Sequence, residues 1–376
     1  MSSILIIGGG VIGLTLAREL HQKGVRKITI VERGAIGKEA SFAAAGMLSP
    51  QAEADRADEF FDFCNDSRDL FPFFSARLLD ETGIDIELDT SGTLYAAFTK
   101  KDVEELRERF EWQKAYGLQT EHLSAEETHK IEPFISPDSL ESLFFPDDWQ
   151  VDNRKLIEAL RKYAEINEIK IVENARITKF KDENCRVQGV ITSTGQTFFA
   201  DQMIVTAGAW SSLLKIGNSV LPFPNVKPVR GQMIAFQTTK RLFSRVIYSS
   251  RGYIVPRKDG KILAGATVED VGFDNKTTES GIESLLELSR EISPGIANLS
   301  IVEKWSGLRP FSFDGLPIIG AVSDISNVFA ATGHYRNGIL LAPMTAKILA
   351  DKIVDGKDSN YLKLCNPNRL TKAQAT

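Results

Sequence analysis

The chain has 376 residues, of which 43% are hydrophobic. This length and composition exclude a disordered chain and predict two structural domains with sizeable interiors. Its 45 basic and 50 acidic residues give a formal net charge of -5 without long runs of one sign, which argues against nucleic acid or an anionic membrane as the main partner and favours a small molecule.

The three cysteines, Cys64, Cys185 and Cys365, are odd in number and widely spaced. They therefore predict neither a disulfide framework nor a metal site, and a reducing cytoplasm is the expected location.

The first predicted element is a buried strand, Ile4 to Ile7, followed by a glycine-rich turn and a helix over residues 14–23. The turn, GGGVIG, has the GxGxxG spacing of dinucleotide-binding proteins. Gly8 permits the tight turn, Gly10 lets the backbone approach a pyrophosphate, and Gly13 lets helix and strand pack closely. The glycines and the charges that follow are unlike a signal peptide or a membrane span, and no other stretch reaches spanning length.

A second buried strand is expected in KITIVER, residues 27–33. It ends at Glu32, nineteen residues after Gly13, where a carboxylate accepts hydrogen bonds from an adenosine ribose. The complete unit of strand, turn, helix, strand and acid predicts a bound dinucleotide, although it does not separate FAD from NAD.

Helical patterns follow at 54–82, 102–116, 153–166 and 281–292, with strand-like runs between them. Another buried strand, Gln202 to Thr206, leads into Ala207-Gly208-Ala209. These small residues form either a tight turn or a close approach of the backbone to a ligand. Together with the first glycine turn they indicate a sheet that lines one long cofactor, so the chain is expected to leave this domain and return to it.

Six segments are the most distinctive: GGGVIG with Glu32, SFAAAGMLSPQAE at 41–53, TAGAW at 206–210, GYIVPR at 252–257, WSGLRPFSFDGLPIIG at 305–320 and GHYRNGILLAP at 333–343. In order, and over nearly the whole chain, they resemble the D-amino acid oxidase superfamily of flavoproteins, and within it the glycine oxidases of thiamine biosynthesis. The resemblance implies an α/β fold: a doubly wound, Rossmann-like FAD-binding domain (1–85, 147–218 and 306–376) and a mixed-sheet α+β substrate-binding domain (86–146 and 219–305).

The resemblance also implies a noncovalently held FAD, since residues 305–345 contain no cysteine of the kind that attaches the flavin in monomeric sarcosine oxidase. The residues expected along it are Gly8, Gly10, Val11, Ile12, Gly13, Glu32, Arg33, Ser41, Ala45, Gly46, Met47, Ile177 beside the adenine, Ala207, Gly208, and, at the flavin ring, Gly333, His334, Tyr335, Arg336, Asn337, Gly338 and Ile339. A helix that begins after Asn337 would direct its N–H groups and partial positive charge towards the ring.

For the substrate, the resemblance assigns Arg309 to the carboxylate, Tyr253 to its support and Arg336 to a second active-site arginine. A guanidinium suits a carboxylate because it is a rigid two-pronged donor. Met47 and Val268 are expected in the same pocket, Val268 where glycine oxidases can carry a methionine.

Taken without the resemblance, these side chains have structural alternatives. Arg309 could form an ion pair, Tyr253 and Met47 could fill the core, and Arg336 could cap a carbonyl. His334 is expected to be structural rather than a general base.

The implied reaction removes the α-hydrogen of glycine, sarcosine or a small D-amino acid as hydride. It gives an imine, then an oxo acid and ammonia or amine, with O2 reduced to H2O2. No catalytic side chain is required because the flavin accepts the hydride. The product would supply iminoglycine for the thiamine thiazole, and a homo-oligomer is expected. A D-amino acid dehydrogenase with another acceptor and a noncatalytic FAD-binding subunit stay open as alternatives, whereas the charge disfavours a tRNA-modifying oxidase.

Overall fold

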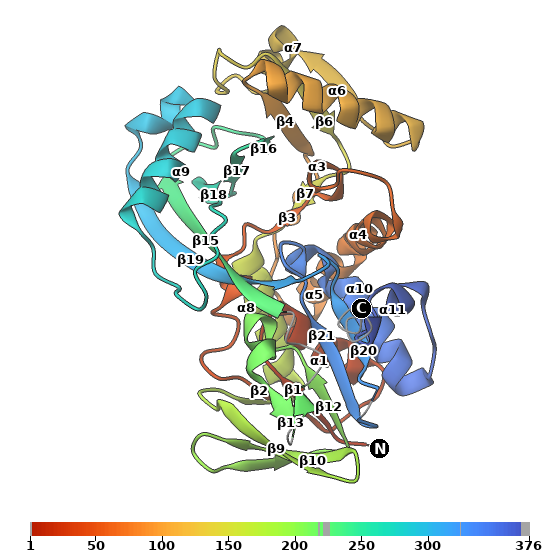
Figure 1. Cartoon of the computed structure of the whole chain (residues 1–376). Helices are drawn as coiled ribbons and strands as arrows, with labels where there is room; N and C mark the ends of the chain where they lie inside the picture. The colour runs from red at the N-terminus through yellow and green to blue at the C-terminus, as the bar shows by residue number, and fades with distance from the viewer. Residues whose placement is uncertain (1, 217–218, 221–225, 324, 370–376) are drawn as a thin grey trace.

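The computed structural model describes residues 2–216, 219–220, 226–323 and 325–369. Two large sheets lie towards opposite ends of the molecule (Figure 1). One has six strands in the order β20-β21-β12-β1-β2-β8, and the other has eight in the order β19-β15-β18-β17-β16-β4-β6-β5.

The six-stranded sheet is parallel except for β20, which pairs antiparallel with β21. Its strands are β1 (Ile4–Ile7), β2 (Ile28–Val31), β8 (Lys170–Val172), β12 (Gln202–Val205), β20 (Ile318–Ala321) and β21 (Val328–Thr332). The first, second and fourth of these are the strands predicted from sequence.

Both faces of this sheet are covered, which explains why β1 is apolar throughout. Ile4 and Ile6 pack with residues of the helices α1 (Val11–Gln22), α8 (Asn153–Ile166) and α10 (Gly338–Asp355). Leu5 and Ile7 pack on the other face against an antiparallel sheet of β9 (Ile177–Glu183), β10 (Arg186–Thr192) and β11 (Thr197–Phe199). The second layer is therefore a small sheet rather than a set of helices.

The eight-stranded sheet is mixed, because β16 and β4 are parallel while the other neighbours are antiparallel. Its strands are β4 (Thr93–Ala97), β5 (Glu121–Ser124), β6 (Glu141–Phe145), β15 (Val226–Gln237), β16 (Val246–Ser249), β17 (Gly252–Pro256), β18 (Lys261–Gly265) and β19 (Ile301–Ser312). The long strands β15 and β19 extend from this sheet towards the six-stranded one (Figure 1). Helix α9 (Glu279–Ile292) packs on one face through Ile282, Leu285 and Leu288.

The remaining elements are α2 (Ala40–Ala43), β3 (Met47–Leu48), α3 (Pro50–Glu53), α4 (Glu59–Asp69), α5 (Phe71–Thr82), α6 (Lys100–Ala115), α7 (Ala125–Ile131), β7 (Trp149–Gln150), the 3-10 helices η1 (Gly208–Leu213) and η2 (Pro294–Asn298), β13 (Lys215–Ile216), β14 (Ser219–Val220) and α11 (Asn360–Leu364). The helix predicted over 54–82 is two helices, α4 and α5. Pro72 lies in the first turn of α5, where its missing N–H is tolerated, and a helix begins afresh there.

The strands of the six-stranded sheet come from residues 4–31, 170–205 and 318–332, and those of the eight-stranded sheet from 93–145 and 226–312. The domain boundaries drawn from sequence stay a prediction, and β19 crosses the one placed between residues 305 and 306. The predicted segment ends at residues 1, 218 and 376 lie outside the described residues.

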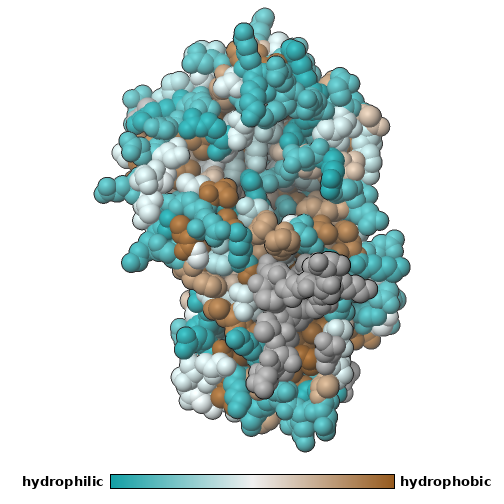
Figure 2. All heavy atoms as spheres, in the orientation of Figure 1, coloured by the Kyte–Doolittle hydropathy of each residue, from teal (hydrophilic) through white to brown (hydrophobic). Residues whose placement is uncertain are grey.

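Hydrophilic residues cover most of the upper end of the face seen in Figure 2, whereas hydrophobic ones gather around its middle and lower half. The most exposed large hydrophobic side chains, Phe73, Phe199 and Phe313, come from different parts of the chain, as is normal for single surface residues. Among the helices that the structure describes, none combines the length and apolarity needed to cross a membrane.

Candidate active site

A cavity of about 780 Å³ is lined by residues of both large sheets. Gly8, Glu32 and Ile177 contribute to the part beside the six-stranded sheet. Tyr253 and Arg309 contribute to it from strands β17 and β19 of the eight-stranded sheet. Most of the predicted cofactor and substrate residues thus meet in one space.

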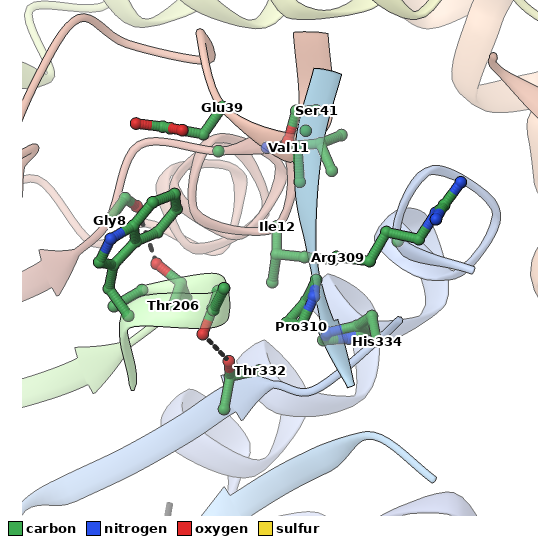
Figure 3. A pocket seen from close by; sticks show the side chains of 18 of the residues that line it. Gly8, Val11, Ile12, Glu39, Ser41, Thr206, Arg309, Pro310, Thr332 and His334 are labelled. Carbon is green, nitrogen blue, oxygen red and sulfur yellow. Dashed lines mark hydrogen bonds between the residues drawn. The ribbon is translucent and has the colours of Figure 1, made fainter. Parts of the chain in front are cut away.

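The glycine turn between β1 and α1 is shaped by close backbone contacts. Gly8 has a φ of +115°, and a Cβ there would lie 2.5 Å from the Thr206 carbonyl oxygen. Thr206 Oγ1 donates to the Gly8 carbonyl at 2.8 Å (Figure 3). A Cβ on Gly13 would overlap that same Gly8 carbonyl. Gly13 does not line the cavity, so its place in the motif is to let α1 pack on β1.

The start of α1 leaves backbone donors available to a ligand. The Val11 N–H donates to Ser41 Oγ at 2.9 Å. The N–H groups of Gly10 and Ile12 have no acceptor within the described part of the chain, and both residues line the cavity. Unpaired N–H groups at a helix N-terminus form an anion site.

Glu32 fixes this turn from the end of β2. Its side chain is buried and accepts from the Gly9 N–H at 2.7 Å and the Gly34 N–H at 3.0 Å. A carboxylate has about four acceptor positions, so capacity remains for ribose hydroxyls. The neighbouring Arg33 stacks on the Trp210 ring at 3.5 Å and pairs with Glu39.

Most other residues predicted along the cofactor also line the cavity. They are Ser41, Ala45, Gly46, Met47, Ile177, Ala207, Gly208 and His334 to Ile339. Gly333 is not among them. Its φ of +74° places it in the turn that leads from β21 into this segment.

Helix α10 begins at Gly338, as the sequence predicted, and its N-cap Asn337 makes no side-chain capping bond. The N–H groups of Gly338 and Ile339 lack an acceptor among the described residues and lie at the cavity, so the positive end of the helix dipole is open to a ligand. The preceding segment is joined to β19, because the Tyr335 N–H donates to the Pro310 carbonyl at 2.9 Å and Phe311 bridges His334.

His334 is buried, and its Nε2 lies 3.1 Å from Thr345 Oγ1. Burial lowers the pKa of its imidazole to about 3. The ring is therefore neutral near pH 7, which suits a structural residue better than a proton carrier.

Arg309 carries an available charge. One of its guanidinium nitrogens, Nη1, donates to the Thr267 carbonyl at 3.0 Å, and the group lies so close to Gly231 that a Cβ there would overlap it. Arg309 has no carboxylate partner among the residues that the structure describes. Beside it, the buried Tyr253 hydroxyl points at Met233 Sδ, 3.6 Å away. Burial raises the pKa of Tyr253, and the charge of Arg309 opposes that shift.

Arg336, in contrast, is already paired. Its Nη2 donates to Glu53 Oε1 at 2.8 Å and to Tyr248 Oη at 2.9 Å, and the Tyr248 hydroxyl donates to the same Glu53 oxygen at 3.0 Å. Sequence reasoning missed Glu53 and Tyr248. Glu53 is the one acidic residue in the segment SFAAAGMLSPQAE, and this could have marked it as a candidate site residue. Nothing in the neighbouring sequence indicates that its partner is Arg336.

Val268 does not occupy the predicted position. Its side chain is 61% exposed and lines a separate hollow beside α9 instead of the large cavity. The reason is the direction of the backbone after β18: Thr267 and Glu269 turn inwards and hydrogen-bond Gln232, which leaves Val268 facing out.

Comparison with known proteins shows which family the chain belongs to. A family model described as FAD dependent oxidoreductase, DAO, matches residues 3–352. The chain belongs to this DAO family. It is 34% identical over 357 residues to a glycine oxidase of Pseudomonas aeruginosa, covering 94% of this chain and 95% of that protein.

Two further members of the DAO family are similar over nearly the whole chain. The bifunctional protein ThiO/ThiG of Trichormus variabilis is 35% identical over 99% of this chain, which spans only 56% of that longer protein. The crystal structure of glycine oxidase from Geobacillus kaustophilus superposes with a TM-score of 0.90 at 30% identity, covering 98% of each chain.

These findings confirm the predicted fold class, the FAD cofactor and the oxidase assignment: this DAO family member is an FAD-dependent amine or amino acid oxidase. The residues fit the cofactor, because unpaired N–H groups stand at the starts of α1 and α10 and the glycine turn admits close approach. The noncovalent attachment and the roles of individual residues stay predictions.

Proposed function

We propose that the enzyme oxidatively deaminates glycine and other small amines, such as sarcosine and small D-amino acids, with O2 as the electron acceptor. The observation that carries the proposal is Arg309, whose charge lies at the cavity beside Tyr253 without a carboxylate partner in the described chain. An unpaired guanidinium next to a hydroxyl suits a substrate carboxylate. Similarity to the glycine oxidases supports the choice of a small amino acid.

In this proposal the protein orients the substrate and keeps its surroundings dry. FAD, when bound, supplies the acceptor for the hydride that leaves the α-carbon. Arg309 holds the carboxylate, and Tyr253 donates a hydrogen bond to it. Met47 and Met233 form apolar walls of the cavity, which limits water around the reacting carbon. The open start of α10 favours negative charge close by.

The substrate leaves as an imine, which water hydrolyses to an oxo acid and ammonia. For glycine the imine is iminoglycine, and we propose that it enters the thiamine thiazole. Similarity to the bifunctional protein ThiO/ThiG supports this placement.

The test is peroxide production by purified, FAD-loaded protein in air-saturated buffer, with glycine, sarcosine and D-alanine compared by kcat/KM. We expect peroxide from all three, with glycine the best substrate. If the amines bleach the flavin without oxygen but yield no peroxide in air, the enzyme is a dehydrogenase with another acceptor. If no amine bleaches the flavin, the chain is a noncatalytic FAD-binding subunit.

A further inference from the structure

Two of the arginines that line the cavity, Arg309 and Arg336, act on Tyr253, and of these two only Arg309 has no carboxylate partner in the described chain. The charged groups that act on the Tyr253 hydroxyl are Arg309, Arg336 and Glu53. Arg309 is unpaired within the described chain, whereas Arg336 and Glu53 form an ion pair of 2.8 Å. With Glu53 ionised, this end of the cavity carries one net positive charge, which matches one carboxylate.

The pair is part of the cavity wall. Both Arg336 and Glu53 line the cavity, and their side chains are 32% and 17% exposed, so a ligand can reach them. An ion pair that is largely removed from water is weak evidence of stabilisation, because the desolvation of both charges offsets their attraction. Its position therefore points to an effect on what enters the cavity.

Hydrogen bonds to neighbouring residues hold Glu53 in place. It ends α3, whose Gln51 and Ala52 N–H groups donate to the buried Asp148 carboxylate at 3.0 and 2.8 Å. The Tyr248 hydroxyl donates to Glu53 and accepts from Arg336. The bonds from α3 to Asp148 and the bond from the Tyr248 hydroxyl thus direct the Glu53 carboxylate to Arg336 rather than to solvent.

We propose that Glu53 is a specificity-determining residue, which withholds Arg336 from ligands so that the site accepts amines with one carboxylate and rejects those with two. A second carboxylate near Arg336 would meet a guanidinium that is already neutralised and would be repelled by Glu53. The inference rests on the proposed amine oxidation for its substrates, but the charge argument concerns carboxylate binding alone.

The test is Glu53→Gln, which removes the charge and keeps the shape and an acceptor oxygen. Equilibrium binding of malonate and of acetate, neither of which is oxidised, is followed by the absorbance change of the bound flavin. We expect the ratio of the acetate Kd to the malonate Kd to rise about tenfold or more, since a freed arginine can make charge-assisted bonds to the second carboxylate. Turnover of D-aspartate relative to D-alanine should rise in the same direction.

Two further variants test whether the change in the Kd ratio depends on the position of Glu53 at the cavity and on Arg336. Glu303→Gln removes a carboxylate that pairs with Arg154 at 2.7 Å and is 31% exposed, against 17% for Glu53, but that lies outside the cavity lining. In this variant the ratio should stay at its wild-type value. In Glu53→Gln combined with Arg336→Gln, the gain should disappear. Thermal unfolding and flavin content establish that each variant is folded and loaded.

Different results would contradict the proposed amine oxidation and the proposed role of Glu53. If the wild-type protein oxidises no amine, the proposed function is wrong, while the malonate and acetate measurements still decide the role of Glu53. If Glu53→Gln binds malonate no better relative to acetate than the wild type does, or if the gain persists without Arg336, Glu53 does not set specificity.

Discussion

At the scale of single residues, Arg309 and Arg336 show how neighbours decide what a charge can do. Both are arginines at the same cavity, but Arg336 is paired with Glu53, whereas Arg309 donates to the Thr267 carbonyl and has no carboxylate partner among the described residues. The sequence identified both positions through the family resemblance. It could not distinguish their states, because Glu53 and Arg336 are 283 residues apart.

Arg309→Lys tests the two-pronged contact, because lysine keeps the charge and loses the fork. We expect the KM for glycine to rise about tenfold or more, corresponding to about 1.4 kcal/mol or more of lost binding. Arg309→Ala should weaken binding further while the protein retains FAD. Steady-state kinetics and the flavin-to-protein absorbance ratio measure the two effects. A near-normal KM in Arg309→Ala would remove this residue from the role of carboxylate anchor.

His334 should make stability depend on pH in the acid range. Its pKa is about 3 in the folded protein because of burial, against about 6.5 in an unfolded chain. The unfolded state therefore takes up a proton that the folded state does not, and stability is lost as pH falls from about 6.5 towards 3, by at most about 1.4 kcal/mol per pH unit.

Denaturant unfolding of the FAD-saturated protein between pH 6.5 and 4 measures this slope. The comparison is with His334→Gln, which does not titrate and keeps a polar group near Thr345. We expect the variant to lose less stability than the wild type over that interval. Equal slopes would show that His334 does not supply the difference.

At the scale of elements, the contact between β1 and α1 depends on the absence of a side chain at Gly13. A Cβ there would overlap the Gly8 carbonyl, so Gly13→Ala must displace the helix or the turn, with a destabilisation of about 1–3 kcal/mol and weaker FAD binding. Gly34→Ala is the matched control, since a Cβ at Gly34 meets nothing within 4 Å. Denaturant unfolding and FAD titration of the two variants test this, and equal behaviour would contradict it.

Local patterns predicted some elements and not others. The strands β1 and β2, the helix α8 and the start of α10 were readable because apolar spacing and glycines act within a few residues. The break between α4 and α5 was missed although Pro72 signals it. The outward direction of Val268 could not be read, because it depends on Gln232, more than thirty residues earlier, which bonds the side chains on either side.

At the scale of the whole molecule, the predicted cofactor site draws on segments from almost the full length of the chain. Residues of β1, the loop before β3, the segment after β12 and the start of α10 line one cavity. The dispersed motifs predicted a discontinuous FAD-binding domain, and this division stays a prediction. Sequence reasoning did not anticipate the three-stranded sheet over the second face, whose strands carry no motif.

Because FAD would contact all these segments, its removal should lower the stability of the whole folded chain. We expect apoprotein to unfold at a lower temperature than protein with FAD at 100 times its Kd, a difference of about 2.7 kcal/mol in the free energy of unfolding. Calorimetry measures the shift, and NAD added in place of FAD is the control that should not restore stability. An apoprotein as stable as the FAD-loaded protein would show that FAD does not bind the folded chain in preference to the unfolded one.

The backbone bonds between β19 and the segment before α10 have a consequence for how the enzyme can change. The Tyr335 N–H is bonded to the Pro310 carbonyl, next to Arg309. Backbone bonds rather than a single side chain therefore fix the distance between the proposed carboxylate anchor and the start of α10. Evolution or engineering can then reshape the walls of the pocket to admit a bulkier amine without altering the distance between the anchored end of the substrate and the helix that faces it.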